Sequence, residues 1–384
     1  MEYYRFGRVV VPEGGLFDDA ASAIEFATNL EDGVINEQIQ NLSFTTDDEG
    51  TLVVLVNNKR YFITITALKE LCKMLKVPAS YLNKFPGRTL VLENLNNNPY
   101  LKDNSDTVKL VVWQSEDYPV IAGVLPGIDP AMQMTEFLEM MRDNGVFERE
   151  TSKLDQIAIS DEEIVVYFYL PEEMTHERFK FQLGYSIHYA STRMVDTIVS
   201  PFVKMTVVTG SGEPFDFDFE SSKKLRIAKR KKEDFLSETI EIVQTYNGND
   251  LGVYYEEAVK CGMLSRNIDS VRFAILKFLK SKATSVYNYN GVKVDANQVA
   301  EEVIPEYMEF YKAHKDELKK METYAANNLQ VNFYLPIYLN RFFTFQANIE
   351  NPNFMIRYRK AIGQAMTKML DEVGDLVVDV QRNG

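Results

Sequence analysis

The stretch that decides the fold is Phe179-Lys180-Phe181-Gln182-Leu183-Gly184-Tyr185-Ser186-Ile187-His188-Tyr189. Aromatic and β-branched residues fill it, as is typical of a β-strand. Two runs of the same character, Ile164–Leu170 and Thr197–Val208, flank it along the chain. Three neighbouring long strands predict one antiparallel sheet. Pro201 cannot donate to a sheet ladder, so we expect the third strand to bend or to lie at an edge there.

The chain before this sheet mixes short helices and strands. Leu52–Val56 and Arg60–Ile65 are β-branched runs separated by Asn57-Asn58-Lys59, which predicts a hairpin. Thr66 is a suitable N-cap for the helix that follows it. The pattern predicts helices at Phe17–Leu30, Ala67–Leu75, Ala79–Phe85 and Pro130–Arg142, and strands at Val108–Gln114, Pro119–Leu125 and Phe215–Phe219.

The hydrophobic period changes from two to 3.6 near residue 232, and the sequence after that point has helical periodicity. The sequence therefore predicts an α+β fold, with an antiparallel sheet and flanking helices in the N-terminal two thirds and an all-helical C-terminal third. We expect a mixed domain over residues 1–232 and a helical domain over residues 233–384, the latter for interaction or oligomerisation.

Composition limits the class of protein. The chain has 384 residues, is 45% hydrophobic and carries a net charge of −14. It has enough apolar residues for a sizeable core, and Cys72 and Cys261 are expected to be reduced core thiols. Met1–Arg5 lacks a secretory leader, and no apolar run approaches the about 20 residues of a membrane helix. We expect a cytoplasmic protein with no membrane partner.

One cationic segment stands out in this acidic chain. The basic run, Lys223–Lys232, contains seven cations: Lys223, Lys224, Arg226, Lys229, Arg230, Lys231 and Lys232. If it is helical, Arg226, Lys229 and Arg230 share one face and can follow a phosphate backbone without reading bases. The alternative is a solvated helix start or linker whose cations pair with nearby acids such as Glu233, Asp234 and Glu238.

Phe215–Glu220 alternates phenylalanines with carboxylates, which places Asp216, Asp218 and Glu220 on one face of a strand. Carboxylates at this spacing are possible ligands for Mg²⁺ or Ca²⁺. The simpler interpretation is a half-buried strand with a wet acidic face, opposite the basic run. No further carboxylate cluster supports the metal site, so we expect no metal and no cofactor.

Other patterns are weaker. Thr66–Phe85 is similar to a helix-turn-helix, but its second helix would offer DNA mainly Ser80, Asn83 and Lys84, so a packed helical corner is the simpler interpretation. The residues Ser186, His188, Arg193 and Asp196 form a candidate polar site at a strand end, although a hydrogen-bonded structural histidine is the simpler role. Thr209-Gly210-Ser211-Gly212 lacks the lysine and helix of a phosphate-binding loop. The sequence carries no enzyme signature, and enzymatic activity is not expected.

Two segments resemble the phage- and plasmid-borne family of unknown function labelled "phage/plasmid-like protein". The first is Ile65–Pro86, with an apolar helix, a Val-Pro turn and Tyr-Leu followed by a proline. The second is Gly184–Gly212, although Ala190-Ser191 and Val208-Thr209-Gly210 depart from the family pattern. The resemblance spans about residues 50–235 and implies a mobile-element origin, where DNA replication, recombination and anti-defence proteins are common, but no known chemistry.

Two functions follow from these observations. The first is a phage- or plasmid-encoded DNA-metabolism accessory that binds single-stranded DNA through the basic run, in strand annealing or recombination. The second is an acidic interaction factor for assembly, virion association or anti-defence, with phage or host proteins as partners and no nucleic-acid binding. We expect a homo-oligomer in either case, because the aromatic-rich helical third is suited to subunit contacts.

Overall fold

The structure is a computed structural model. It describes residues 14–48, 50–78, 82, 88–115, 118–128, 132–176, 179–193, 195–208, 214–220, 225–227, 238, 241, 352, 355, 356, 359 and 360. Roughly the first 200 residues form an α+β fold with two mostly antiparallel sheets and flanking helices. The α+β class is therefore confirmed, while the expected helices of the C-terminal third lie mostly outside the described residues. No helix in the described part is long and apolar enough to cross a membrane.

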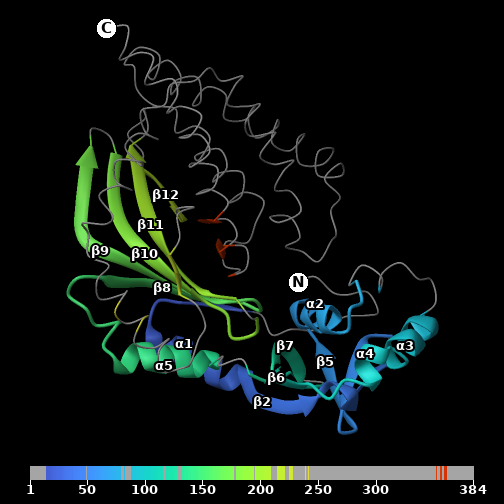
Figure 1. Ribbon diagram of the computed structural model, residues 1–384. Helices are drawn as coiled ribbons and strands as arrows, with labels where there is room; N and C mark the ends of the chain where they lie inside the picture. The colour runs from blue at the N-terminus through green and yellow to red at the C-terminus, as the bar shows by residue number, and fades with distance from the viewer. Residues whose placement is uncertain are drawn as a thin grey trace, which may run out of the picture.

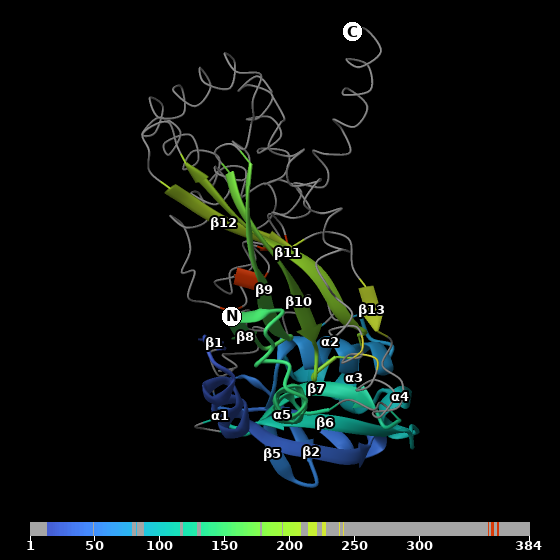
Figure 2. The ribbon, with the colours of Figure 1, turned by 90° about the vertical axis from the view of Figure 1, so that its left-hand side faces the viewer.

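The larger sheet contains the three predicted strands in its centre (Figures 1 and 2). Its order is β1-β8-β9-β10-β11-β12, and β13 pairs with another part of β11. The strands are β1 (Gly15–Phe17), β8 (Lys153–Ile159), β9 (Ile164–His176), β10 (Phe179–Tyr189), β11 (Thr197–Val208), β12 (Pro214–Glu220) and β13 (Leu225–Ile227).

Prolines mark the irregular places of this sheet. On its outer side, β11 pairs with β13 over Thr197–Val199 and with β12 over Phe202–Val208, so Pro201 falls between the two partners. Because β11 pairs with β10 along its other side, it is an inner strand and the edge alternative is wrong; Pro201 stands where the outer partner changes. Pro171 lies where the β9–β10 register shifts, and Gln182 Nε2 donates to the carbonyl of Leu170 there at 3.2 Å. Both prolines therefore stand where a backbone donor is not needed on that side.

The sequence did not predict the smaller sheet as a separate sheet. One parallel contact, between β5 and β7, joins the predicted hairpin to the predicted strand pair. The strand order of this sheet is β2-β6-β7-β5-β4-β3. Its strands are β2 (Glu31–Gln38), β3 (Leu42–Thr46), β4 (Leu52–Val56), β5 (Lys59–Ile63), β6 (Thr107–Trp113) and β7 (Val120–Pro126), with a 3₁₀ turn at Ile39–Asn41. Asn57 and Asn58 have φ of 50° and 65°, the left-handed pair that a tight hairpin turn requires.

Five helices flank the sheets: α1 (Ala20–Leu30), α2 (Ile65–Met74), α3 (Arg88–Asn96), α4 (Pro99–Lys102) and α5 (Met134–Asp143). The N-cap of α2 is Thr64 and not the expected Thr66: its hydroxyl accepts from Ala67 N at 3.0 Å and donates to the carbonyl of Ala122 at 3.1 Å. Helices α2 to α4 cover the core of the smaller sheet, in which Leu82 and Cys72 are buried. The free, buried thiol of Cys72 is as predicted.

The two faces of the larger sheet differ in chemistry. One face is aromatic: Phe168 stacks on Tyr185, and Tyr189 stacks on Phe137 of α5 at 4.3 Å between ring centroids. Gly123 of β7 lies close to the turn after β10, since a Cβ added at Gly123 would lie 2.6 Å from the Cα of Thr192. The other face of the larger sheet carries charge, and Met355, Ile356, Arg359 and Lys360 contact it.

Gly184 is the position where this sheet tolerates no side chain. A Cβ added there would lie 1.9 Å from the carbonyl oxygen of Phe168 on β9. We expect Gly184→Ala to lower the free energy of unfolding by about 3 kcal/mol, because the backbone of a central strand must shift. Urea unfolding followed by tryptophan fluorescence measures this. The control Thr175→Ala, at an exposed position of β9, should change it by less than about 1 kcal/mol, and an equal loss in both would contradict the steric explanation.

Candidate functional site

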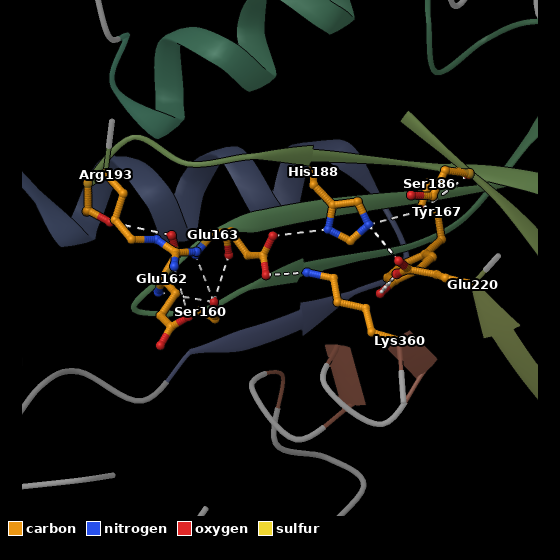
Figure 3. A network of polar contacts seen from close by, with 11 residues as sticks. Ser160, Glu162, Glu163, Tyr167, Ser186, His188, Arg193, Glu220 and Lys360 are labelled. Atoms are coloured by element: carbon orange, nitrogen blue, oxygen red, sulfur yellow. Dashed lines mark hydrogen bonds and ion pairs between the residues drawn. The ribbon is translucent and has the colours of Figure 1, made fainter. Parts of the chain in front are cut away.

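A buried chain of charges runs across the second face of the larger sheet, centred on His188 of β10 (Figure 3). Its Nδ1 lies 3.1 Å from Glu163 Oε2, and its Nε2 lies 2.9 Å from Glu220 Oε2. Ser186 Oγ is 3.1 Å from the same Nε2. Each ring nitrogen of His188 therefore faces one buried carboxylate, Glu163 on one side and Glu220 on the other.

The sheet register explains why these residues meet. Ser186 pairs with Tyr167 of β9, and Phe202 of β11 pairs with Glu220 of β12. Alternate residues of neighbouring strands thus present Tyr167, Ser186, His188 and Glu220 to one face. The Tyr167 hydroxyl donates to Glu220 Oε1 at 3.1 Å, which gives this buried carboxylate a second partner.

Lys360 lies at one end of this buried row of charged side chains. Its Nζ lies 2.6 Å from Glu163 Oε1. Burial alone would raise the pKa of Glu163, but the Lys360 ammonium and His188 hold that pKa well below its usual range. Burial would also raise the pKa of Glu220, but the attraction and hydrogen bonding of His188, together with the charge of Lys360, outweigh it and lower that pKa. Both glutamates are therefore ionised in the folded protein at neutral pH.

Arg359 forms a second arm on the same face. Its Nη2 lies 2.5 Å from Asp218 Oδ2 of β12 and 3.9 Å from Asp155 of β8. The guanidinium also stands 4.1 Å from the ring centroid of Tyr167 and 4.9 Å from that of Phe202. Burial opposes its charge, yet Asp218 raises its pKa above the ordinary value. Burial raises the pKa of Asp155, and Arg359 only partly offsets this.

The order Ser186–His188–Glu163 is that of a catalytic triad, but the surroundings argue against catalysis. Glu220 already occupies the nitrogen that would take the proton from the serine, and Ser186 is completely buried. With both ring nitrogens engaged and the serine enclosed, no substrate reaches this pair, and the arrangement is that of a buried polar network that supports the sheet.

Only part of the expected polar site is assembled. Ser186 and His188 do meet, whereas Arg193 pairs with Glu162 at 3.3 Å. No hydrogen bond or ion pair joins Asp196 to the cluster within the described residues. Glu163, Arg359 and Lys360 were missed. The sequence did contain a signal for Glu163, because it directly precedes a predicted buried strand next to the strand that carries His188. Nothing in the sequence marks Arg359 or Lys360.

The acidic face of β12 is not the solvent-exposed face that the alternation predicted. Asp218 is held by Arg359, and Glu220 is 1% exposed and held by His188 and Tyr167. Asp216 lies in β12, and its side chain is outside what the structure describes. Within the described residues, no group of three His, Cys, Asp or Glu side chains could hold a metal ion.

The basic run is a strand where it is described. Leu225–Ile227 forms β13 and pairs antiparallel with β11, with Arg226 opposite Ile198. A helix is therefore wrong at these three residues, because their backbone pairs with the part of β11 that β12 does not cover. Lys223, Lys224, Lys229, Arg230, Lys231 and Lys232 lie outside the described residues.

A pocket of about 350 Å³ lies between α2 and the turns that contain Glu162 and Arg193. Lys69 and Lys73 line it together with Thr66 and Cys72. Burial raises the pKa of the Cys72 thiol to about 11, so the thiol is protonated and unreactive at neutral pH.

Comparison with known proteins finds no matching family model, no matching curated protein and no matching solved structure. The resemblance to the phage- and plasmid-borne family thus stays a prediction, and function must be argued from the chain itself.

The lowered pKa values predict how stability depends on pH. A glutamate in the unfolded chain titrates near 4.5, above Glu163 and Glu220 in the folded protein. The stabilisation from both is therefore complete above pH about 5.5 and falls as pH drops below about 4.5, when the unfolded chain binds more protons. Thermal unfolding across pH 3 to 8 should show this fall. It should be smaller in the folded E163Q/E220Q variant, and an unchanged profile would contradict the assignment.

Two adjacent glutamates, Glu162 and Glu163, allow the stability contribution of the buried network to be compared with that of a partly exposed ion pair. E163Q removes the charge that faces both Lys360 and His188, and we expect it to lower the free energy of unfolding by about 3–5 kcal/mol. E162Q removes only the carboxylate that pairs with Arg193, and its side chain is 29% exposed, so the loss should stay below about 1 kcal/mol. Urea unfolding of both variants compares them, and equal losses would refute the buried network as a major source of stability.

Proposed function

We propose that this protein is a phage- or plasmid-encoded DNA-metabolism accessory in the host cytoplasm. It binds single-stranded DNA through the basic run without reading sequence, and acts as a homo-oligomer in annealing or recombination. In an otherwise acidic molecule, one dense cationic segment concentrates the attraction for a polyanion.

The engagement of two acids shortly before the basic run supports this proposal. Asp218 binds Arg359, and Glu220 is enclosed with His188 and Tyr167. These two carboxylates already have partners within the sheet, which favours a run that is left to bind phosphates.

The strand β13 adds a second support. Its pairing with β11 ties the run to the larger sheet at Arg226. A cationic segment held on a sheet loses less conformational entropy on binding a phosphate backbone than a free tail does.

Charge reversal tests the site. In the variant K229E/R230E/K231E/K232E we expect affinity for a fluorescent oligo-dT strand to fall about a hundredfold or more, as the contacts with phosphates are lost. Wild-type binding should weaken steeply between about 50 and 200 mM salt, with a slope of about −0.7 per phosphate neutralised. Fluorescence anisotropy measures both.

The matched control is K69E/K73E/K76E/K102E, which makes the same charge change at exposed lysines of the α2–α4 region. It should bind nearly as well as the wild type, and an equal loss would show that net charge, not the run, matters. If the wild type does not bind DNA at low salt, the proposal is wrong. An oligomer resistant to salt, seen by light scattering without DNA affinity, would then favour the acidic interaction factor.

A further inference from the structure

The pocket beside α2 has the size and the setting of a small-molecule site. Its volume of about 350 Å³ falls within the range of about 300–1,000 Å³ that such sites occupy. One wall is α2, which lies on the side of the smaller sheet nearer the larger sheet (Figure 2). The other wall contains Glu162, between β8 and β9, and Arg193, after β10. The pocket therefore lies where the two sheets approach each other.

Contacts between the two sheets fix the two walls of the pocket relative to each other. Thr64, the N-cap of α2, donates to the carbonyl of Ala122 on β7 at 3.1 Å. The next residue, Gly123, approaches the main chain of Thr192 so closely that a Cβ there would lie 2.6 Å from the Thr192 Cα. The Thr192 hydroxyl in turn donates to the carbonyl of Glu162 at 3.5 Å. Both walls are therefore in place before a ligand binds, which lowers the entropy cost of binding.

Two polar side chains of α2 line the pocket and have no partner within the described part of the chain. Thr66 is 9% exposed, and no hydrogen bond engages its hydroxyl there. Lys69 lies one helical turn further on, and no ion pair or hydrogen bond with a described residue engages its ammonium. Residues three apart on a helix are neighbours, with about 5–6 Å between their Cβ atoms. One bound group can therefore contact both the hydroxyl and the ammonium.

The charge of the lining indicates which ligand fits. Lys73 pairs with Glu70 at 2.6 Å, and Arg193 pairs with Glu162 at 3.3 Å. These two pairs balance in charge, so Lys69 gives the described lining an excess of one positive charge. A phosphate group offers several acceptor oxygens and negative charge, which matches an ammonium beside a hydroxyl donor.

The pocket also has an apolar part. Val77 and Pro78, which follow α2, contribute to the lining. A ligand that carries only a phosphate would leave these side chains without a contact, whereas carbon atoms attached to the phosphate would bury apolar surface against them. The lining therefore fits an organic phosphate better than the inorganic ion.

We propose that this pocket binds a small phosphate monoester, whose phosphate contacts Thr66 and Lys69 and whose organic part packs against Val77 and Pro78. This site goes beyond the proposed function. It shares no residue with the basic run, and it takes a small molecule and not a DNA strand.

The test is titration calorimetry of the full-length protein with inorganic phosphate and glycerol phosphate as probes. We expect saturable binding of both, tighter binding of glycerol phosphate, and no binding of glycerol, which lacks the charge. K69Q should weaken the binding of both probes about tenfold or more, because a charged hydrogen bond is lost. T66V removes one neutral hydrogen bond and should weaken it about threefold to tenfold.

The matched control is K59Q, which removes an exposed lysine at the hairpin of the smaller sheet, outside the pocket. K59Q should bind both probes as the wild type does. Lys69 is also exposed, so K69Q should keep the thermal midpoint of the wild type. If T66V does not fold, the comparison of K69Q with K59Q still decides the test.

The outcomes keep this proposal separate from DNA binding. A wild type that binds neither probe, or equal losses in K69Q and K59Q, would show that the pocket is not a phosphate site. Equal affinities for inorganic phosphate and glycerol phosphate would overturn the part assigned to Val77 and Pro78. K69Q should bind oligo-dT as the wild type does, so loss of probe binding with DNA binding intact supports the pocket. A wild type that binds the probes but not oligo-dT overturns only the proposed function.

Discussion

Four carboxyl groups on one sheet face set the main constraint on this molecule. Asp155, Glu163, Asp218 and Glu220 stand where the sheet is covered, and an ionised carboxylate in such a place needs a partner. His188 is a partner of two of them from within the sheet. The two cations, Arg359 and Lys360, come from a distant part of the chain. The covered face is therefore complete only when both parts of the sequence are folded together.

This dependence bears on the expected division of the chain near residue 232. The boundary stays a prediction, but residues on its far side contribute to the core and charge balance of the larger sheet. The described residues Met355, Ile356, Arg359 and Lys360 thus take part in the packing and the charge balance of the larger sheet.

Local sequence was sufficient where the answer depends on neighbouring residues. The strands β9 to β11 follow from long aromatic and β-branched runs, and the asparagine pair at residues 57 and 58 predicts its hairpin. Pro201 did not mark an edge strand; it stands where β11 changes from one outer partner to the other, which depends on strands far away in the sequence. The strand β2 was missed, since its alternation is between half-buried and exposed positions and its sequence, Glu31–Gln38, is mostly polar.

The candidate site was harder to predict because it depends on partners far apart in the sequence. Alternation correctly placed Asp218 and Glu220 on one face, but it could not show that a helix covers that face. A carboxylate next to solvent and one beneath an arginine have the same local sequence. The same reasoning explains the choice between Thr64 and Thr66 as helix cap: both fit locally, and the carbonyl of Ala122, on another strand, favours Thr64.

The close approach of Gly123 to Thr192 has a practical consequence for dissecting this protein. A side chain at position 123 would collide with the main chain of Thr192, so this approach of the smaller sheet to the turn after β10 requires glycine. Separate expression of either half would uncover a surface shaped only for the other. Truncation series should therefore treat the whole α+β body as the smallest unit worth producing.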